Sequence, residues 1–236
     1  STPLYSSAAS DVYKRQWQDS REQTDMITSS NNAKVKQVVQ WQTKAKERRK
    51  DHVFLAEGVR MCEEAPVKSV REVYLTEELE QKLRRNAQNG DTAFWDKLQQ
   101  TGYETVSPEV FAKMADTQTP QGILTVLEQP SYDLTQLLEQ PEPLFLILEN
   151  LQDPGNLGTM IRTGEGAGIT GVIMNQQTVD IFNPKTIRAT MGSIFRVPFV
   201  YVSELSPVLT QMHERGIHTY AAHLKGQKYY DSFSFR

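Results

Sequence analysis

The sequence predicts an α/β protein with two domains joined by a linker. Short apolar runs alternate with segments of helical periodicity along most of the chain, which is typical of strands and helices packed in layers. The alternation stops at residues 129–143, which contain three prolines and suit a linker. A length of 236 residues is enough for two small domains. We therefore predict one domain at residues 26–128 and a second at residues 144–236.

The composition excludes several classes of protein. Hydrophobic residues make up 38% of the chain, and no apolar run approaches the ~18 residues that cross a bilayer, so no membrane partner is expected. Cys62 is the single cysteine, which excludes an intramolecular disulfide and fits a reducing, cytoplasmic setting. The four histidines show no metal-ligand spacing, so no metal site is expected. A net charge of −3 argues against non-specific coating of nucleic acid but permits a local basic patch.

The first domain follows a polar leader. Residues 1–25 lack periodicity and a continuous apolar core, so we interpret them as a disordered leader, with Met26 as the expected start. Helical spacing of apolar residues then predicts a helix over residues 33–50. The later elements are expected to be strands at 52–56, 70–76, 103–106 and 123–128 and helices at 58–65, 77–88, 91–100 and 108–115. This order predicts a mostly parallel sheet with helices on its faces.

Basic residues crowd the segment from 34 to 50. Seven lysines and arginines are opposed there only by Glu47, so the local balance is seven minus one, or +6. A phosphate backbone is the obvious partner for such a cluster, and salt would weaken the attraction. The alternative is a solvated helix face without a partner. The candidate phosphate contacts are Lys34, Lys36, Lys44, Lys46, Arg48 and Arg49.

A second alternating series fills the rest of the chain. Strands are expected at 144–148, 171–174, 198–202 and 218–222, with helices at 157–167, 184–193 and 204–215. The first strand would deliver residues 150–156 to the carboxyl edge of the sheet, where ligands gather in open α/β sheets. Asp153-Pro154 predicts a helix N-cap followed by a first-turn proline, and Asn183-Pro184 predicts another.

The helix after residue 156 combines several glycines with one arginine. The face expected to pack on the sheet consists of Leu157, Met160, Ile161 and Gly164. Gly158, Arg162 and Gly166 share another face. Because each interior glycine costs roughly 1 kcal/mol relative to alanine, we infer that a substrate or a second subunit approaches the backbone near Arg162. The alternative is a surface ion pair between Arg162 and Glu165.

Several of these segments resemble a known family. LENLQDPGNLGTMIRTGEGAG at residues 148–168 and NPKTIRATMGSIFRVPF at residues 183–199 resemble the first two motifs of the SpoU (TrmH-like) branch of the SPOUT RNA methyltransferases. SSNNAKVKQVV, FLAEGVR at 54–60 and TQTPQGILTV at 117–126 resemble the family's accessory domain. The resemblance implies an N-terminal L30e-like domain that grips substrate RNA and a C-terminal SPOUT domain with a parallel sheet and a trefoil knot.

The resemblance also implies a reaction, the transfer of a methyl group from S-adenosylmethionine to a ribose 2′-hydroxyl of rRNA or tRNA. Asn156 and Arg162 match the motif-one asparagine and arginine, which stand six positions apart. A guanidinium with a pKa above ~12 is a poor base, so Arg162 is expected to clamp a phosphate and stabilise the 2′-oxyanion. Asn156 would fix the ribose hydroxyl or orient Arg162, while Lys185 and Arg188 would meet RNA phosphates. The family further implies a homodimer, with each site completed near the subunit interface.

The family's last motifs are missing from the sequence after residue 203. Nothing there resembles its Gly-Asn-Glu-Gly loop, its Ile-Pro-Met strand end or its Ser-Leu-Asn helix start. We therefore expect the SPOUT domain to be incomplete and the chain to be truncated. The remaining cofactor contacts are expected in the loop after the strand at 218–222, at Ala222, His223, Leu224 and Gly226.

Two alternatives to the methyltransferase stay open. The missing motifs favour an RNA-binding module without catalysis. The other is an unrelated nucleotide-binding α/β enzyme such as an oxidoreductase. Gly164, Gly166 and Gly168 count against that enzyme, because they form G-x-G-x-G inside a helix rather than G-x-G-x-x-G before one.

Overall fold

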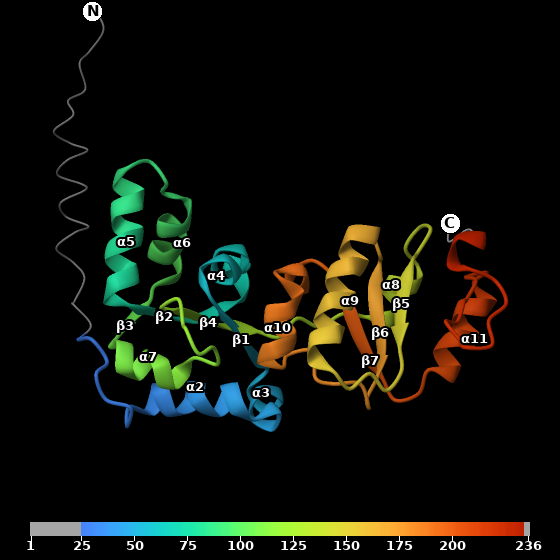
Figure 1. Ribbon diagram of the computed structural model, residues 1–236, viewed down its shortest axis with the longest axis horizontal. Helices are drawn as coiled ribbons and strands as arrows, with labels where there is room; N and C mark the ends of the chain where they lie inside the picture. The colour runs from blue at the N-terminus through green and yellow to red at the C-terminus, as the bar shows by residue number, and fades with distance from the viewer. Residues whose placement is uncertain (1–24, 234–236) are drawn as a thin grey trace, which may run out of the picture.

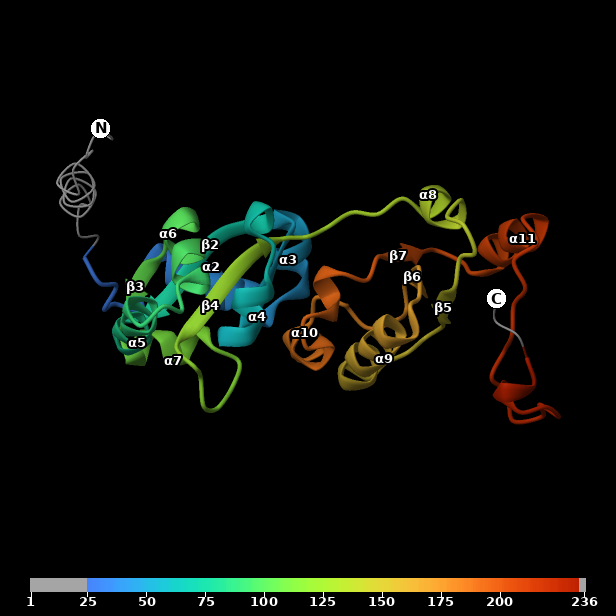
Figure 2. The same cartoon turned by 90° about the horizontal axis from the view of Figure 1, so that it is seen from above.

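The computed structural model describes residues 25–233 and consists of two α/β domains that lie side by side in an elongated molecule (Figure 1). The predicted leader therefore lies, apart from Asp25, outside the described residues. Residues 129–144 run along one side of the molecule between the two domains and contain one short helix, α8 (Leu134–Leu138) (Figure 2). Among the described helices, none has the length and apolar character that a bilayer crossing needs.

The N-terminal domain contains a four-stranded sheet with helices on both faces. The strand order is β1 (Val53–Glu57), β4 (Ile123–Glu128), β2 (Val70–Thr76) and β3 (Glu104–Val106). β2 and β3 are parallel, but β4 runs antiparallel to both of its neighbours. The prediction of a mostly parallel sheet is wrong here, because alternation identifies the elements but not the direction in which the last strand enters. The helices are α2 (Ala33–Thr43), α3 (Ala45–Asp51), α4 (Val59–Glu64), α5 (Glu77–Gln88), α6 (Ala93–Thr101) and α7 (Pro108–Met114).

The helix predicted over residues 33–50 is broken into α2 and α3. Lys44 adopts an extended conformation with φ −122° and ψ 109°. The guanidinium of Arg48 donates to the carbonyls of Trp41 at 2.7 Å and Gln42 at 3.3 Å. These carbonyls at the end of α2 are thus satisfied by a side chain rather than by a continued helix. Apolar periodicity cannot show such a break.

The C-terminal domain contains a parallel sheet, as predicted. The strand order is β5 (Phe145–Leu148), β6 (Gly171–Asn175) and β7 (Phe199–Val202). The helices are α9 (Pro154–Ala167), α10 (Pro184–Thr190) and α11 (Ser206–Glu214). The strand predicted at 218–222 is wrong, because these residues are exposed, pair with no strand among the described residues and form neither helix nor strand.

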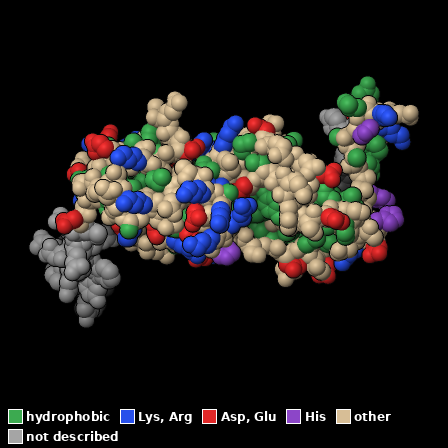
Figure 3. All heavy atoms as spheres, turned by 90° about the horizontal axis from the view of Figure 1, so that it is seen from below, with side chains coloured by type: hydrophobic (Ala, Val, Ile, Leu, Met, Phe, Trp, Pro, Cys, Tyr) green, Lys and Arg blue, Asp and Glu red, His purple; other side chains and the backbone are tan. Residues whose placement is uncertain are grey.

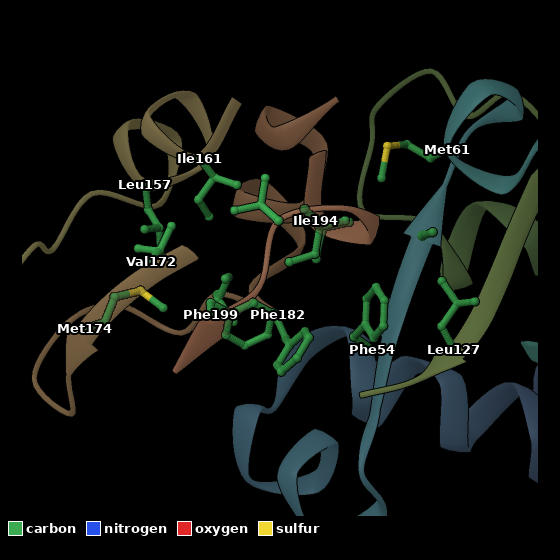
Figure 4. Close-up of a cluster of buried hydrophobic side chains, with 14 of the residues drawn as sticks. Phe54, Met61, Leu127, Leu157, Ile161, Val172, Met174, Phe182, Ile194 and Phe199 are labelled. Carbon is green, nitrogen blue, oxygen red and sulfur yellow. The ribbon is translucent and has the colours of Figure 1, made fainter. Parts of the chain in front are cut away.

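A shared apolar core joins the two domains. Phe54 of β1 packs against Phe182, with ring centroids 5.0 Å apart, and Phe182 packs against Phe199 of β7 at 5.6 Å. Met61 and Leu127 extend the same cluster within the N-terminal domain (Figure 4). Burial of this apolar surface favours a fixed arrangement of the two domains over independent motion.

Three arginines add ion pairs across this joint. Arg48 of α3 pairs with Asp180 at 2.6 Å, and Arg188 of α10 pairs with Asp116. Arg196 bridges two carboxylates, Glu64 of α4 at 2.9 Å and Glu165 of α9. The charged contacts therefore come from three separate parts of the chain.

Close packing of α10 against α9 depends on Gly158. A Cβ at this position would lie 2.5 Å from the Ala189 Cβ and 2.7 Å from the Thr186 carbonyl oxygen. By contrast, apart from the adjoining residues and the backbone of α9 itself, no atom of the described residues lies within 4 Å of the Cβ position at Gly166 on the same helix.

Replacement of these two glycines by alanine is expected to have opposite effects. Gly158→Ala overpacks the joint between α9 and α10 and should lower the free energy of unfolding by about 1–3 kcal/mol. Gly166→Ala, the matched control, should leave it unchanged or raise it by up to roughly 1 kcal/mol. Urea denaturation measures both, and equal effects would contradict the packing described for Gly158.

The ion pairs of Arg196 should make the free energy of unfolding depend on pH in the acidic range. Hydrogen bonds from Arg196 hold the pKa of Glu64 and Glu165 below its ordinary value. Both carboxylates then stabilise the fold above the unfolded pKa, and this contribution is lost as pH falls through the lower folded values.

We therefore expect the denaturation midpoint to fall between about pH 5 and pH 3, and to fall less in Arg196→Met than in the unmodified protein. Arg71→Met, which breaks an ion pair with Glu128 inside the N-terminal domain, is the control. Identical pH profiles for Arg196→Met and the unmodified protein would contradict the bridge.

Candidate RNA and methyl-acceptor site

The N-termini of α9 and α10 lie together at the carboxyl edge of the C-terminal sheet. The Asp153 carboxylate accepts from the Asn156 backbone N–H at 2.6 Å, and the Asn183 side chain accepts from the Lys185 N–H at 2.9 Å. Both predicted N-caps are confirmed. Lys185 Nζ lies 3.8 Å from Asp153 Oδ2, which places the first turns of the two helices side by side.

A side-chain network holds the turn before α9. Asn175, at the end of β6, accepts from the Asn150 N–H and donates to the Asn150 side chain, both at 2.9 Å. Asn150 itself adopts a left-handed conformation with φ +55°, which asparagine tolerates better than most residues. Thr178 also donates to Asn175 at 2.9 Å, and the Val179 N–H donates to the Leu151 carbonyl at 2.8 Å. The loops after β5 and β6 therefore form one connected structure.

Sequence reasoning missed the role of Asn175. Its only signal was a polar residue placed directly after an apolar strand, a pattern shared by many residues without a special role. The buried amide becomes informative only when its three hydrogen bonds are known.

Asn156 and Arg162 are both exposed and project from different sides of α9. Six residues of helix separate them by about 9 Å along the axis and turn the second side chain by about 120° from the first. Arg162 forms no ion pair with Glu165, which instead binds Arg196 and Ser193, and it contacts no other charged group in the described part of the chain. The two candidate catalytic residues are thus available to a partner but do not meet within one chain.

The expectation about close approach near Arg162 needs correction. α10 approaches the backbone at Gly158, and Ile169 would lie 2.4 Å from a Cβ at Gly164. These two glycines therefore serve packing within the chain, not contact with a substrate or a second subunit. Met160 was expected to pack on the sheet but is 38% exposed.

The predicted cofactor contacts lie in an exposed turn. The Lys225 N–H donates to His223 Nδ1 at 3.0 Å, and the Gly226 N–H donates to the His223 carbonyl at 2.9 Å. Ala222 is exposed as well, and Leu224 is fully exposed. The strand that was expected to present these residues is not formed. The four residues therefore do not enclose an adenosyl group in this structure.

The predicted RNA-binding residues fall into three groups: four exposed residues, the buried Arg48, and three residues paired with carboxylates. Lys36, Lys44, Lys46 and Arg49 are exposed, and lysine and arginine side chains gather on the face that carries α2 and α3 (Figure 3). Arg48 is 3% exposed and its guanidinium is used inside the protein, so its assignment to an RNA surface is wrong.

The remaining three predicted contacts are already paired with carboxylates. Lys34 pairs with Glu104, Arg188 pairs with Asp116 across the joint, and Lys185 stays exposed beside Asp153. Of these three, Lys185 and Lys34 keep most of their side chain in solvent, whereas the Arg188 side chain is only 33% exposed.

A separate cavity of about 360 Å³ lies in the N-terminal domain, away from α3. It opens between the first turns of α5 and α7 and the loop before β4. Its lining includes Thr76, Glu78, Lys82, Pro108, Phe111 and Gln121. Its mixture of one lysine, one glutamate and apolar side chains does not favour a polyanion.

Two family descriptions match the chain, one on each domain. Residues 143–236 match the SpoU rRNA Methylase family, and residues 32–125 match the MRM3-like substrate binding domain. The chain is 36% identical over 188 residues to the 23S rRNA (guanosine(2553)-2′-O)-methyltransferase RlmP of Bacillus subtilis, covering 76% of this chain and 68% of that relative. The chain spans only 40% of the length of a second curated relative and 26% of the length of a third.

Solved structures show the same arrangement. The rRNA methyltransferase from Sinorhizobium meliloti superimposes with a TM-score of 0.72 at 26% identity, covering 90% of this chain and 78% of that one. Its AdoMet-bound form gives a TM-score of 0.65, covering 80% and 68%.

Proposed function

Because the chain belongs to the SpoU rRNA methylase family of RNA methyltransferases, we propose that it methylates a ribose 2′-hydroxyl of ribosomal RNA, with S-adenosylmethionine as methyl donor. The family uses this cofactor, and a solved neighbour contains it. The relative from Bacillus subtilis is named for the same reaction on 23S rRNA. These relationships favour rRNA over tRNA as the substrate.

The observation that carries the proposal is the position of Asn156. It stands in the first turn of α9 at the sheet edge, and its N-cap Asp153 lies 3.8 Å from Lys185 Nζ. An amide at this place can hold a ribose hydroxyl, while the lysine can hold the adjoining phosphate. Correct alignment of the hydroxyl supplies much of the acceleration in such a transfer.

The four residues expected to contact the cofactor do not form a pocket for it in this structure. Ala222, His223, Leu224 and Gly226 are all exposed to solvent. We therefore assign roles only on the side of the RNA acceptor. Arg162 would stabilise negative charge on the 2′-oxygen or the neighbouring phosphate, which its permanent charge allows.

We further propose a homodimer that covers the exposed face of α9. Met160 is 38% exposed there, and Arg162 projects from the edge of this face without a partner in the described chain. A second subunit would bury the methionine and complete the surroundings of Arg162. The cytoplasm is the proposed compartment, supported by the single reduced cysteine, Cys62.

A non-catalytic RNA-binding module is the second candidate. The exposed turn at residues 222–226 favours it, because RNA contact through α3 needs no cofactor pocket. Calorimetry with S-adenosylmethionine and a binding assay with rRNA separate the two functions. Binding of RNA without binding of the cofactor would support the module.

Transfer of a labelled methyl group to rRNA tests the enzyme directly. We expect Arg162→Ala to lower the transfer rate at least about a hundredfold, because charge on the acceptor loses its stabilising cation. Arg215→Ala removes an exposed arginine from the end of α11 and should leave the rate unchanged. Transfer that survives Arg162→Ala would remove this residue from the proposed role.

The salt dependence of RNA binding tests the basic surface. Replacing Lys44, Lys46 and Arg49 by glutamine should reduce the magnitude of the slope of log affinity against log salt by about 2 to 3, since each lost phosphate contact removes roughly 0.7–0.9. The control replaces the same number of charges on α5, at Lys82, Arg84 and Arg85. A larger reduction of the slope by the control set would place the RNA on α5 and would contradict RNA binding at α3.

A further inference from the structure

We propose that Arg48 is a positioning residue, whose buried ion pair with Asp180 holds the basic helix α3 in register with the first turn of α9, which carries Asn156. The two domains then present one rigid surface that fits a folded RNA contacting both of them at once. This inference rests on the proposed function for its ligand, but the rigid joint can be tested without RNA.

Arg48 uses its guanidinium on both domains at the same time. One terminal nitrogen donates to the Trp41 and Gln42 carbonyls at the end of α2, and the other donates to Asp180 Oδ2 at 2.6 Å. The side chain is 3% exposed, and that of Asp180 is 20% exposed. A planar fork of donors can make these contacts together, whereas an ammonium group at one point cannot.

Hydrogen bonds connect the loop of Asp180 to the turn before α9, which presents Asn156. Asp180 lies next to Val179, whose N–H donates to the Leu151 carbonyl, two residues before Asp153. Asp153 in turn accepts from the Asn156 N–H. The loop that receives Arg48 is therefore bonded directly to the turn that presents Asn156.

The neighbouring residue Arg49 lies near the same loop but faces solvent. Burial raises the pKa of the Tyr201 phenol, Asp180 adds to this effect, and the positive charge of Arg49 opposes it. Tyr201 donates to the Val179 carbonyl at 2.6 Å and accepts from the Ile181 N–H at 2.9 Å. Tyr201 therefore holds the loop at residues 179–181, whose Asp180 binds Arg48, the residue next to the exposed Arg49.

A fixed domain arrangement should affect the affinity for a folded RNA but not the affinity for a short single strand. A short oligonucleotide can bind α3 alone, and its affinity does not depend on how the domains are arranged. A rigid RNA that touches α3 and Lys185 together gains from a fixed separation between these sites, because the second contact is then made at a high effective concentration.

Adjacent arginines provide a matched pair of variants. Arg48→Met removes the ion pair with Asp180 but no exposed charge, and Arg49→Met removes an exposed charge but leaves that ion pair in place. Arg48→Lys keeps the positive charge but lacks the planar guanidinium with its several donors. This variant replaces Arg48→Met in the experiment if the methionine variant does not fold. Thermal unfolding reports whether each variant retains a cooperative fold.

The first measurement is the arrangement of the two domains. It is given by the distance between spin labels at Gln88→Cys on α5 and at Glu214→Cys on α11. Burial raises the pKa of Cys62 to about 12, so this thiol does not compete for the label. We expect a single narrow distance in the unmodified protein and in Arg49→Met. We expect a broader or shifted distribution in Arg48→Met and Arg48→Lys.

RNA affinity is measured second, with an rRNA stem-loop and a short single-stranded oligonucleotide. Arg48→Met should weaken binding of the stem-loop by about tenfold and leave the oligonucleotide unchanged, whereas Arg49→Met should weaken both. An unchanged distance in the Arg48 variants, or an equal loss for both RNAs, would overturn the proposal. If the unmodified protein binds no RNA, the proposed function fails, while the distances still decide whether Arg48 fixes the joint.

Discussion

The double packing of α10 is the constraint on which the rest of the structure depends. On one side Gly158 lets Ala189 and Thr186 approach the backbone of α9. On the other side Ile187 enters the apolar cluster that includes Phe54 of β1, and Arg188 pairs with Asp116. A helix held in this way fixes the sheet edge of one domain relative to the helices of the other. The position of any RNA that touches both domains is then set by the fold itself.

The same joint divides the basic residues into two kinds. Arg48, Arg188 and Arg196 are bound by carboxylates across the domains, while the lysines of α3 and Arg49 face solvent. Only the Arg48 pair is buried; the pairs of Arg188 and Arg196 are partly exposed. Such pairs are weak evidence for stability, but they can specify one geometry. We attribute to the three arginines the orientation of the domains, and to the exposed cations the attraction for a polyanion.

Much of the fold follows from local sequence signals. The two N-caps at Asp153 and Asn183 and the parallel strands β5 to β7 were predictable, because capping chemistry and short apolar runs act over a few residues. The antiparallel entry of β4 and the break at Lys44 were not, since both depend on contacts between distant parts of the chain.

The candidate site was predictable in its residue types but not in its surroundings. Asn156 stands at the expected sheet edge, yet the purpose of Gly158 and the burial of Arg48 emerge only when α10 and Asp180 are in place. A basic run in a sequence does not show which of its members turn inward. The family likeness was readable from motifs because those residues keep fixed spacing along the chain.

We expect one bound rRNA to lie across α3 and the first turns of α9 and α10. Photochemical cross-linking of the protein to its rRNA substrate, followed by mass spectrometry of the linked peptides, tests it most directly. The account predicts cross-links at Lys46 or Arg49 and at Lys185 from a single RNA, with the methylated ribose between the two contacts. Cross-links confined to α5, α7 and the cavity between them would contradict it.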